Sequence, residues 1–124
     1  MFNKIYAQAM PSERVKYGTV NFTNDPKGVK ACEGYGSSYF LLKPSVKTRC
    51  TLTDMDSGYY YSSVGTFQFC FHILNKLTDE EIQAAFSASR GLEVSSDSIG
   101  VYKEIQVHGP IEFKEDIERI YVNK

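Results

Sequence analysis

The sequence lacks tryptophan, and among its 124 residues only two are histidines and three are cysteines. Two histidines without a partner at ligand spacing disfavour a metal hydrolase, so we expect no metal site. The three cysteines, Cys32, Cys50 and Cys70, are odd in number and widely spaced. This pattern disfavours a disulfide framework and favours free thiols in a reducing compartment.

Long apolar runs and an excess of one charge are missing as well. The N-terminal segment MFNKIYAQAMPSER has no apolar core of the kind found in secretory signals, and no run approaches transmembrane length. The formal net charge of −1 gives no global attraction to nucleic acid or to an anionic membrane. We therefore expect no membrane and no nucleic acid as partner, and a protein that is cytoplasmic or is a secreted effector without a conventional signal peptide.

The composition is typical of one globular domain. Hydrophobic residues make up 42% of the chain, charged residues 23% and aromatic residues 14%, which argues against disorder. The length leaves room for one hydrophobic core, so we expect a single domain over residues 1–124. The succession of patterns predicts an α+β fold, mostly antiparallel sheet with one or two helices.

Strand signals recur along the whole chain. Alternating and apolar runs predict strands over 15–22, 37–43, 46–53, 99–108 and 119–122. The Lys-Pro-Ser turn at 43–45 predicts that the second and third of these strands form a hairpin. The glycine within the first strand, Gly18, is typical of a place where a ligand or another backbone comes close.

Helix signals are clearest after residue 77. Thr78, with Glu81 three positions later, forms a capping-box pattern, and the helix that it starts is expected to end near Gly91. A shorter helix is predicted over 3–10, where the next residue is a proline, and a single helical turn around 115–116.

Two other segments have a less regular pattern. The tyrosine-rich segment 54–65 is predicted to be a surface loop, because it is polar and contains glycine. The segment TFQFCFHIL at 66–74 is the most apolar run, and it predicts either a buried strand or the start of a helix.

The strand predicted over 99–108 carries polar side chains on one face only. Val101, Lys103, Ile105 and Val107 fall on one parity, while the other parity carries Tyr102, Glu104, Gln106 and His108. Same-face neighbours lie roughly 6.5–7 Å apart, so one small molecule is able to touch several of them. Taken alone, the pattern is typical of the solvated face of a half-exposed antiparallel sheet.

Other arrangements stay open at this level. Cys32 or Cys70 with His108 has the residue types of a thiol nucleophile and its base, although inert buried cysteine is the commoner state. Arg14 precedes the first predicted strand, and a lone arginine is usually a surface residue.

Four segments carry a resemblance to a known family. They are SERVKYGTVN, YGSSYFLLKPSV, TLTDMDS and YKEIQVHGPIEFKEDIERIYV, in this order. Together they resemble an uncharacterised bacterial domain family whose terminal strand has the pattern Y-x-E-x-Q-x-H-G, followed by D-I-E-x-I. That family in turn looks like a branch of the mono-ADP-ribosyltransferases, with their arginine, serine and glutamate strand motifs. The resemblance spans about Glu13 to Val122 and is loosest between Gly58 and Leu92.

The resemblance implies a split-sheet ADP-ribosyltransferase-like fold and the transfer of ADP-ribose from NAD, the second substrate, to a protein acceptor. It implies that Glu104 is catalytic, because a carboxylate on a rigid strand stabilises the oxocarbenium-like centre that forms when the nicotinamide–ribose bond breaks. The tyrosine-rich segment 54–65 is then expected to recognise the target. The residues that the resemblance assigns to NAD binding are Arg14, Tyr17, Gly18, Ser37, Ser38, Gln106 and His108.

One departure from the family pattern is visible. The transferase motif places its catalytic glutamate second, after a Glu or Gln two residues earlier, whereas this chain has Glu104 first and Gln106 second. The alternative is a catalytically silent module on the same fold that binds NAD, another nucleotide or a protein.

Overall fold

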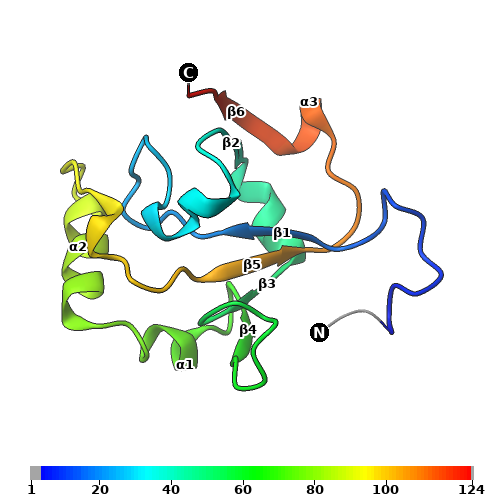
Figure 1. Ribbon diagram of the computed structural model, residues 1–124, viewed down its shortest axis with the longest axis horizontal. Helices are drawn as coiled ribbons and strands as arrows, with labels where there is room; N and C mark the ends of the chain where they lie inside the picture. Colours follow the sequence, from blue (N-terminus) through cyan, green and yellow to red (C-terminus); the bar gives the residue numbers. More distant parts are fainter. Residues whose placement is uncertain (1–3, 124) are drawn as a thin grey trace.

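Residues 4–123, which the computed structural model describes, contain two antiparallel sheets (Figure 1). The larger sheet has the strand order β1-β5-β3-β4, and the smaller one pairs β2 with β6. The strands are β1 (Lys16–Thr19), β2 (Tyr39–Leu42), β3 (Cys50–Thr53), β4 (Val64–Thr66), β5 (Glu104–Val107) and β6 (Ile117–Tyr121). The predicted α+β class with mostly antiparallel sheets is thus confirmed, while the likeness to ADP-ribosyltransferases stays a prediction.

Short helices connect the strands. The α-helices are α1 (Phe71–Leu74), α2 (Asp79–Ser89) and α3 (Phe113–Asp116), and the 3₁₀ helices are η1 (Lys30–Tyr35), η2 (Pro44–Arg49) and η3 (Ser96–Ser98). The predicted capping box starts α2: the Thr78 side chain accepts from the Glu81 N–H at 3.2 Å, and the Glu81 side chain accepts from the Thr78 N–H at 3.0 Å. The helical turn expected near 115–116 is α3.

The helix predicted over 3–10 is wrong. Residues 4–8 form turns instead, and residue 3 lies outside the described part of the chain. So short a segment gains too few backbone hydrogen bonds to cover the cost of starting a helix. Tyr6 from this segment bonds His108 of the distant β5 region, and this contact fixes the segment in its non-helical form.

The predicted hairpin is also wrong. β2 pairs with β6, whereas β3 pairs with β4 and β5, so the two strands belong to different sheets. Pro44 begins η2 between them, because a proline is well suited to the first position of a helix. Val46, predicted to open a strand, is buried in η2 instead.

Three predicted strands are shorter than expected, the last one is shifted to 117–121, and one apolar run is not buried. β1, β3 and β5 each occupy four residues inside their predicted ranges. The run 66–74 forms no buried strand: it leaves β4, turns, and enters α1, where Ile73 alone is buried. Phe69 and Phe71 in this run are 77% and 76% exposed.

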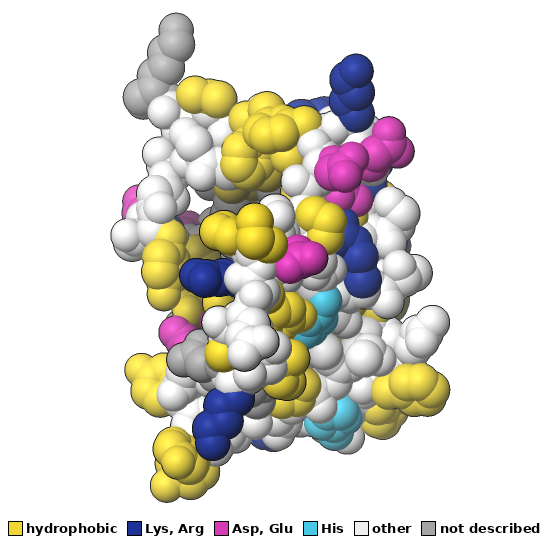
Figure 2. All heavy atoms as spheres, turned by 90° about the vertical axis from the view of Figure 1, so that its right-hand side faces the viewer, with side chains coloured by type: hydrophobic (Ala, Val, Ile, Leu, Met, Phe, Trp, Pro, Cys, Tyr) yellow, Lys and Arg dark blue, Asp and Glu magenta, His cyan; other side chains and the backbone are white. Residues whose placement is uncertain are grey.

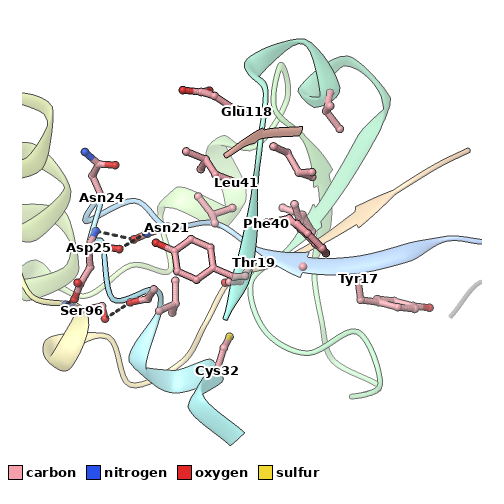
Figure 3. A pocket seen from close by; sticks show the side chains of 18 of the residues that line it. Tyr17, Thr19, Asn21, Asn24, Asp25, Cys32, Phe40, Leu41, Ser96 and Glu118 are labelled. Atoms are coloured by element: carbon pink, nitrogen blue, oxygen red, sulfur yellow. Dashed lines mark hydrogen bonds between the residues drawn. The ribbon is translucent and has the colours of Figure 1, made fainter. Parts of the chain in front are cut away.

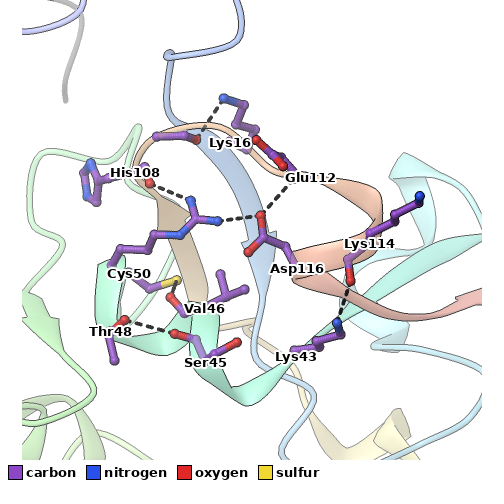
Figure 4. Close-up of polar contacts among 12 residues, drawn as sticks. Lys16, Lys43, Ser45, Val46, Thr48, Cys50, His108, Glu112, Lys114 and Asp116 are labelled. Atoms are coloured by element: carbon purple, nitrogen blue, oxygen red, sulfur yellow. Dashed lines mark hydrogen bonds and ion pairs between the residues drawn. The ribbon is translucent and has the colours of Figure 1, made fainter.

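The core lies between the two sheets. Val46, Cys50 and Val107 are its buried members, and partly buried side chains from both sheets pack against them. The apolar parity of β5 therefore faces the small sheet. An ion pair closes this region (Figure 4): Arg49 Nη2 lies 2.8 Å from Asp116 Oδ2, while Arg49 Nη1 donates to the His108 carbonyl at 2.8 Å.

The surface carries apolar side chains and charged side chains of both signs, interspersed on the face that Figure 2 shows. Within residues 4–123, no helix has the length and apolar character needed to cross a membrane.

Candidate functional site

The polar face of β5 is buried. Glu104 is 6% exposed and Gln106 is fully inaccessible, so the solvated face that the alternation alone suggests is wrong. The reason is the position of the strand: β5 lies between β1 and β3, and both neighbours place hydroxyl-bearing side chains opposite it. Sequence alternation identified the two faces of the strand but not how much chain would cover each of them.

Gln106 is the centre of a hydrogen-bonded row. Its side-chain amide donates to Glu104 Oε1 at 2.7 Å and to Thr53 Oγ1 at 3.1 Å. Its side-chain carbonyl accepts from Thr51 Oγ1 at 2.8 Å. Each polar atom of the amide is satisfied, which is what a buried amide requires. The row therefore holds the Glu104 carboxylate in a fixed position.

The same row determines the tautomer of His108. The hydroxyl of Thr51 gives its one hydrogen to Gln106, so in its 3.0 Å contact with His108 Nε2 it accepts. Nε2 then carries the ring hydrogen, and Nδ1 accepts from the Tyr6 hydroxyl at 2.6 Å. Burial lowers the pKa of His108 below its usual value, in keeping with a neutral ring.

Tyr17 of β1 and Cys32 of η1 both lie within electrostatic range of the Glu104 carboxylate. Burial raises the pKa of the Tyr17 phenol, and the carboxylates of Glu104 and Asp56 raise it further. Burial likewise raises the pKa of the Cys32 thiol, which bonds Thr19 and also feels the Glu104 charge. A thiol with a raised pKa stays protonated, so the arrangement does not support Cys32 as a nucleophile.

A tyrosine clasp, made of Tyr35, Tyr102 and Asp56, closes one side of this region. The Tyr102 hydroxyl donates to Asp56 Oδ2 at 3.0 Å and lies 3.4 Å from the Tyr35 hydroxyl. The two rings meet edge to face, with centroids 6.4 Å apart. Burial and these two bonds raise the pKa of Tyr102 far above its usual value. The clasp ties the tyrosine-rich loop and η1 to the segment that enters β5.

A cleft of about 1350 Å³ lies on the other side of β5, between the two sheets (Figure 3). Tyr17, Thr19 and Cys32 belong both to its rim and to the surroundings of Glu104. β1 is an edge strand and contributes Tyr17 and Thr19 to the lining of the cleft, whereas Glu104 and Gln106 do not line it. No group of three or more histidine, cysteine or acidic side chains suited to a metal ion occurs among residues 4–123.

Comparison with sequence families matches residues 1–91 to the family described as "Protein of unknown function (DUF3626)". The chain belongs to this family. The match includes β1 to β4, α1 and α2, whereas β5 and its polar row follow it. A search of the curated proteins gave no match.

In this DUF3626 chain, four of the residues predicted for the site share one face. Tyr17 is the cross-strand partner of Gln106, and Glu104 and His108 lie on the same parity of β5 and its continuation. Gly18 belongs to the opposite face and lines the cleft, where a Cβ atom would come within 3.3 Å of Ile105.

The other three predicted residues lie apart from this face. Arg14 precedes β1 and is exposed, and its Nε donates to the Ala9 carbonyl at 3.3 Å. Ser37 lines the cleft, and the Ser38 hydroxyl accepts from the Asn123 N–H at 3.1 Å, beside the β2–β6 pair. Arg14 lies outside β1, whereas Thr19, the residue opposite Glu104, is the last residue of that strand.

Sequence reasoning missed the supporting residues of this site. Thr51 and Thr53 alternate within a correctly predicted strand segment, and this parity was the one available signal. Asp56 and Tyr6 gave no local signal, because each reaches the site through a contact distant in sequence.

Proposed function

We propose that this chain transfers ADP-ribose from NAD to a protein side chain, with Glu104 as the catalytic carboxylate. The observation that carries the proposal is the fixed position of that carboxylate: it is buried on a central strand and held at 2.7 Å by the Gln106 amide. A preorganised negative charge in a site shielded from water is the arrangement that best stabilises a developing positive charge.

The reaction breaks the bond between ribose C1′ and the nicotinamide nitrogen, and the electron pair of that bond leaves with nicotinamide. The carboxylate of Glu104 stabilises the resulting oxocarbenium-like ribose and accepts a hydrogen bond from a ribose hydroxyl. A nucleophilic atom of the acceptor then bonds to C1′, and its proton passes to water. Because Gln106 donates without adding charge, the negative charge of the pair stays on Glu104.

NAD would bind at the rim of the cleft, in contact with the lining residues Tyr17, Gly18 and Ser37. His108, neutral and bonded on both ring nitrogens, acts as a support for the row in this proposal. The roles of Arg14 and Ser38 in NAD binding stay predictions. Either side chain would have to move toward the Glu104 face to contact NAD there.

A second candidate is favoured by the separation of Arg14 from the Glu104 face. If these residues never meet, the chain is a catalytically silent module that binds NAD, another nucleotide or a protein.

The test is release of nicotinamide from NAD by the purified chain, without and with a cell lysate as acceptor. We compare wild type with Glu104→Gln, which keeps the shape of the side chain, and with Glu93→Gln, a control at an exposed position. Glu104→Gln is expected to lower the rate by about a hundredfold or more, and Glu93→Gln to leave it unchanged.

Wild-type turnover by Glu104→Gln contradicts the mechanism. NAD binding in calorimetry without any turnover favours the silent module instead. Absence of both binding and turnover leaves only a module that binds something other than NAD.

A further inference from the structure

The cleft between the sheets has an apolar interior that the proposed reaction does not use. Its apolar lining includes Ile105 of β5 and, from the small sheet, Leu41 and Ile117, each of them half-buried. The Glu104 side chain belongs to the opposite parity of β5, so it points away from this interior. A ligand lying between the sheets is therefore in a different place from the reacting bond of NAD.

The cleft is large for a small-molecule pocket. About 1350 Å³ is above the roughly 300–1000 Å³ of ordinary small-molecule pockets. Leu41 and Ile117 line the cleft and stay only half-buried, whereas the neighbouring Leu42 packs against the core. Binding of an apolar group that displaces water from these half-buried side chains is favourable in free energy.

The polar end of the cleft offers little to a ligand. Figure 3 shows Asn24, Asp25 and Ser96 gathered at one end of it. The two oxygens of the Asp25 carboxylate accept from the backbone N–H groups of Lys27 and Ser96, at 2.9 and 2.8 Å. The Ser96 hydroxyl donates to the Gly28 carbonyl and accepts from the Lys30 N–H. Asp25 and Ser96 thus tie two loops together, and a sugar or phosphate that used them would have to break these bonds.

A cationic group lies at the η2 side of the lining. The Lys47 ammonium lies 5.5 Å from the centroid of the Phe67 ring, and both residues line the cleft. Within the described residues, Lys47 has no ion pair and no side-chain hydrogen bond, and η2 contributes no carboxylate. The combination of an apolar interior and an ammonium at its edge is complementary to an aliphatic chain that ends in an anion.

We propose that this cleft binds a long-chain carboxylate, a free fatty acid, with its alkyl chain between the two sheets and its carboxylate at Lys47. The binding needs no covalent step. It goes beyond the proposed transfer reaction and stands whether or not that reaction occurs.

The test uses the full chain and cis-parinaric acid, a fatty acid whose fluorescence increases in apolar surroundings. Ile117→Trp places a bulky indole ring in the cleft and is expected to weaken binding about tenfold or more. The matched control is Ile120→Trp on the same strand, whose side chain is half exposed and does not line the cleft; it is expected to bind as wild type does. Should Ile117→Trp fail to fold, Leu41→Trp on the facing strand carries the same expectation.

The head group is tested by charge reversal. Lys47→Glu is expected to weaken binding of the acid about fivefold or more and to leave binding of its methyl ester unchanged, because the ester has no charge to pair. Lys114→Glu, at an exposed position outside the lining, is the control and should affect neither probe.

Displacement of the probe by palmitate supports the assignment. The proposal is overturned by an absence of saturable binding, by wild-type affinity in the folded cleft variant, or by displacement with NAD or with dodecyl phosphate but not with palmitate. Sedimentation as a dimer that excludes the probe also overturns it, since a second copy then fills the gap.

Discussion

Gln106 and Glu104 are joined side chain to side chain on the central strand, with the amide nitrogen 2.7 Å from the carboxylate oxygen. The order of these residues is the point at which the chain departs from the transferase pattern. An amide at this place has a physical consequence: it supplies a hydrogen-bond donor to the buried carboxylate and adds no second charge beside it.

We expect Gln106→Glu to destabilise the fold at neutral pH. The variant puts two carboxylates side by side in a buried row and removes the donor to Thr53, which we expect to lower the free energy of unfolding by about 2–4 kcal/mol. Repulsion and burial raise the pKa of the pair above the values in the unfolded chain. The loss is therefore largest above the raised folded pKa, and it diminishes as the pH falls toward the unfolded pKa and the pair takes up a proton.

Urea unfolding at pH 7 and pH 5 checks this expectation. Gln68→Glu, at an exposed position, is the matched control and should change stability little at either pH. Equal stability losses for Gln106→Glu at the two pH values would show that the new charge is not buried.

His108 is expected to make stability fall in mild acid. Its folded pKa is lowered by burial, so the unfolded chain takes up a proton first as the pH decreases. The contribution is present above the usual value of 6.5 and is lost progressively as the pH falls through that value toward the folded pKa. Between pH 8 and 5, the unfolding free energy of His108→Gln should depend less steeply on pH than that of wild type.

His72→Gln serves as the comparison, since His72 is exposed and bonds a backbone carbonyl at 2.9 Å. The assignment to His108 fails if His72→Gln removes the slope and His108→Gln retains it.

Local signals predicted the parts of this fold that depend on neighbours in sequence. The capping box at Thr78 and Glu81 satisfies groups three residues apart, so its outcome was fixed within one helical turn. The alternation in β5 correctly separated Ile105 and Val107 from Glu104 and Gln106, because strand periodicity is local. The family resemblance assigned Tyr17 to NAD binding without a strand partner, and the pairing of β1 with β5 places Tyr17 opposite Gln106.

Features that depend on distant partners were not predictable in the same way. The predicted hairpin is wrong because β2 pairs with β6, nearly eighty residues away, and the chain continues from Pro44 into η2. The burial of Gln106 depends on Thr51 and Thr53 arriving opposite it from β3. Tyr6 reaches His108 across 102 residues, and no pattern within either segment indicates the contact.

Glu81 is expected to matter more for stability than the cap that it helps to form. Its carboxylate is 4% exposed, caps Thr78, and lies 3.5 Å from the Lys103 ammonium, which is also buried. Glu81→Gln keeps an acceptor for the cap but leaves a buried ammonium without its counter-charge, at a cost of about 3 kcal/mol or more. Thr78→Ala removes only the cap, at about 1 kcal/mol.

Urea unfolding of the two variants ranks these effects. If Thr78→Ala is the more damaging, Lys103 is solvated well enough to do without its partner. The double change of Glu81→Gln with Lys103→Met removes both charges and should recover part of the stability lost by Glu81→Gln alone.

The tyrosine clasp is expected to control the order of the loop beside Glu104. Tyr102→Phe removes the hydroxyl that donates to Asp56 and keeps the ring against Tyr35. Because one hydrogen bond contributes about 1 kcal/mol, global stability should change little, while amide hydrogen exchange in 54–63 should accelerate. Tyr60→Phe, whose side chain is fully exposed, is the control and should leave exchange unchanged. Unchanged exchange in Tyr102→Phe would mean that the loop is held from its other side, where Asp54 bonds Lys76 and the Ser63 N–H.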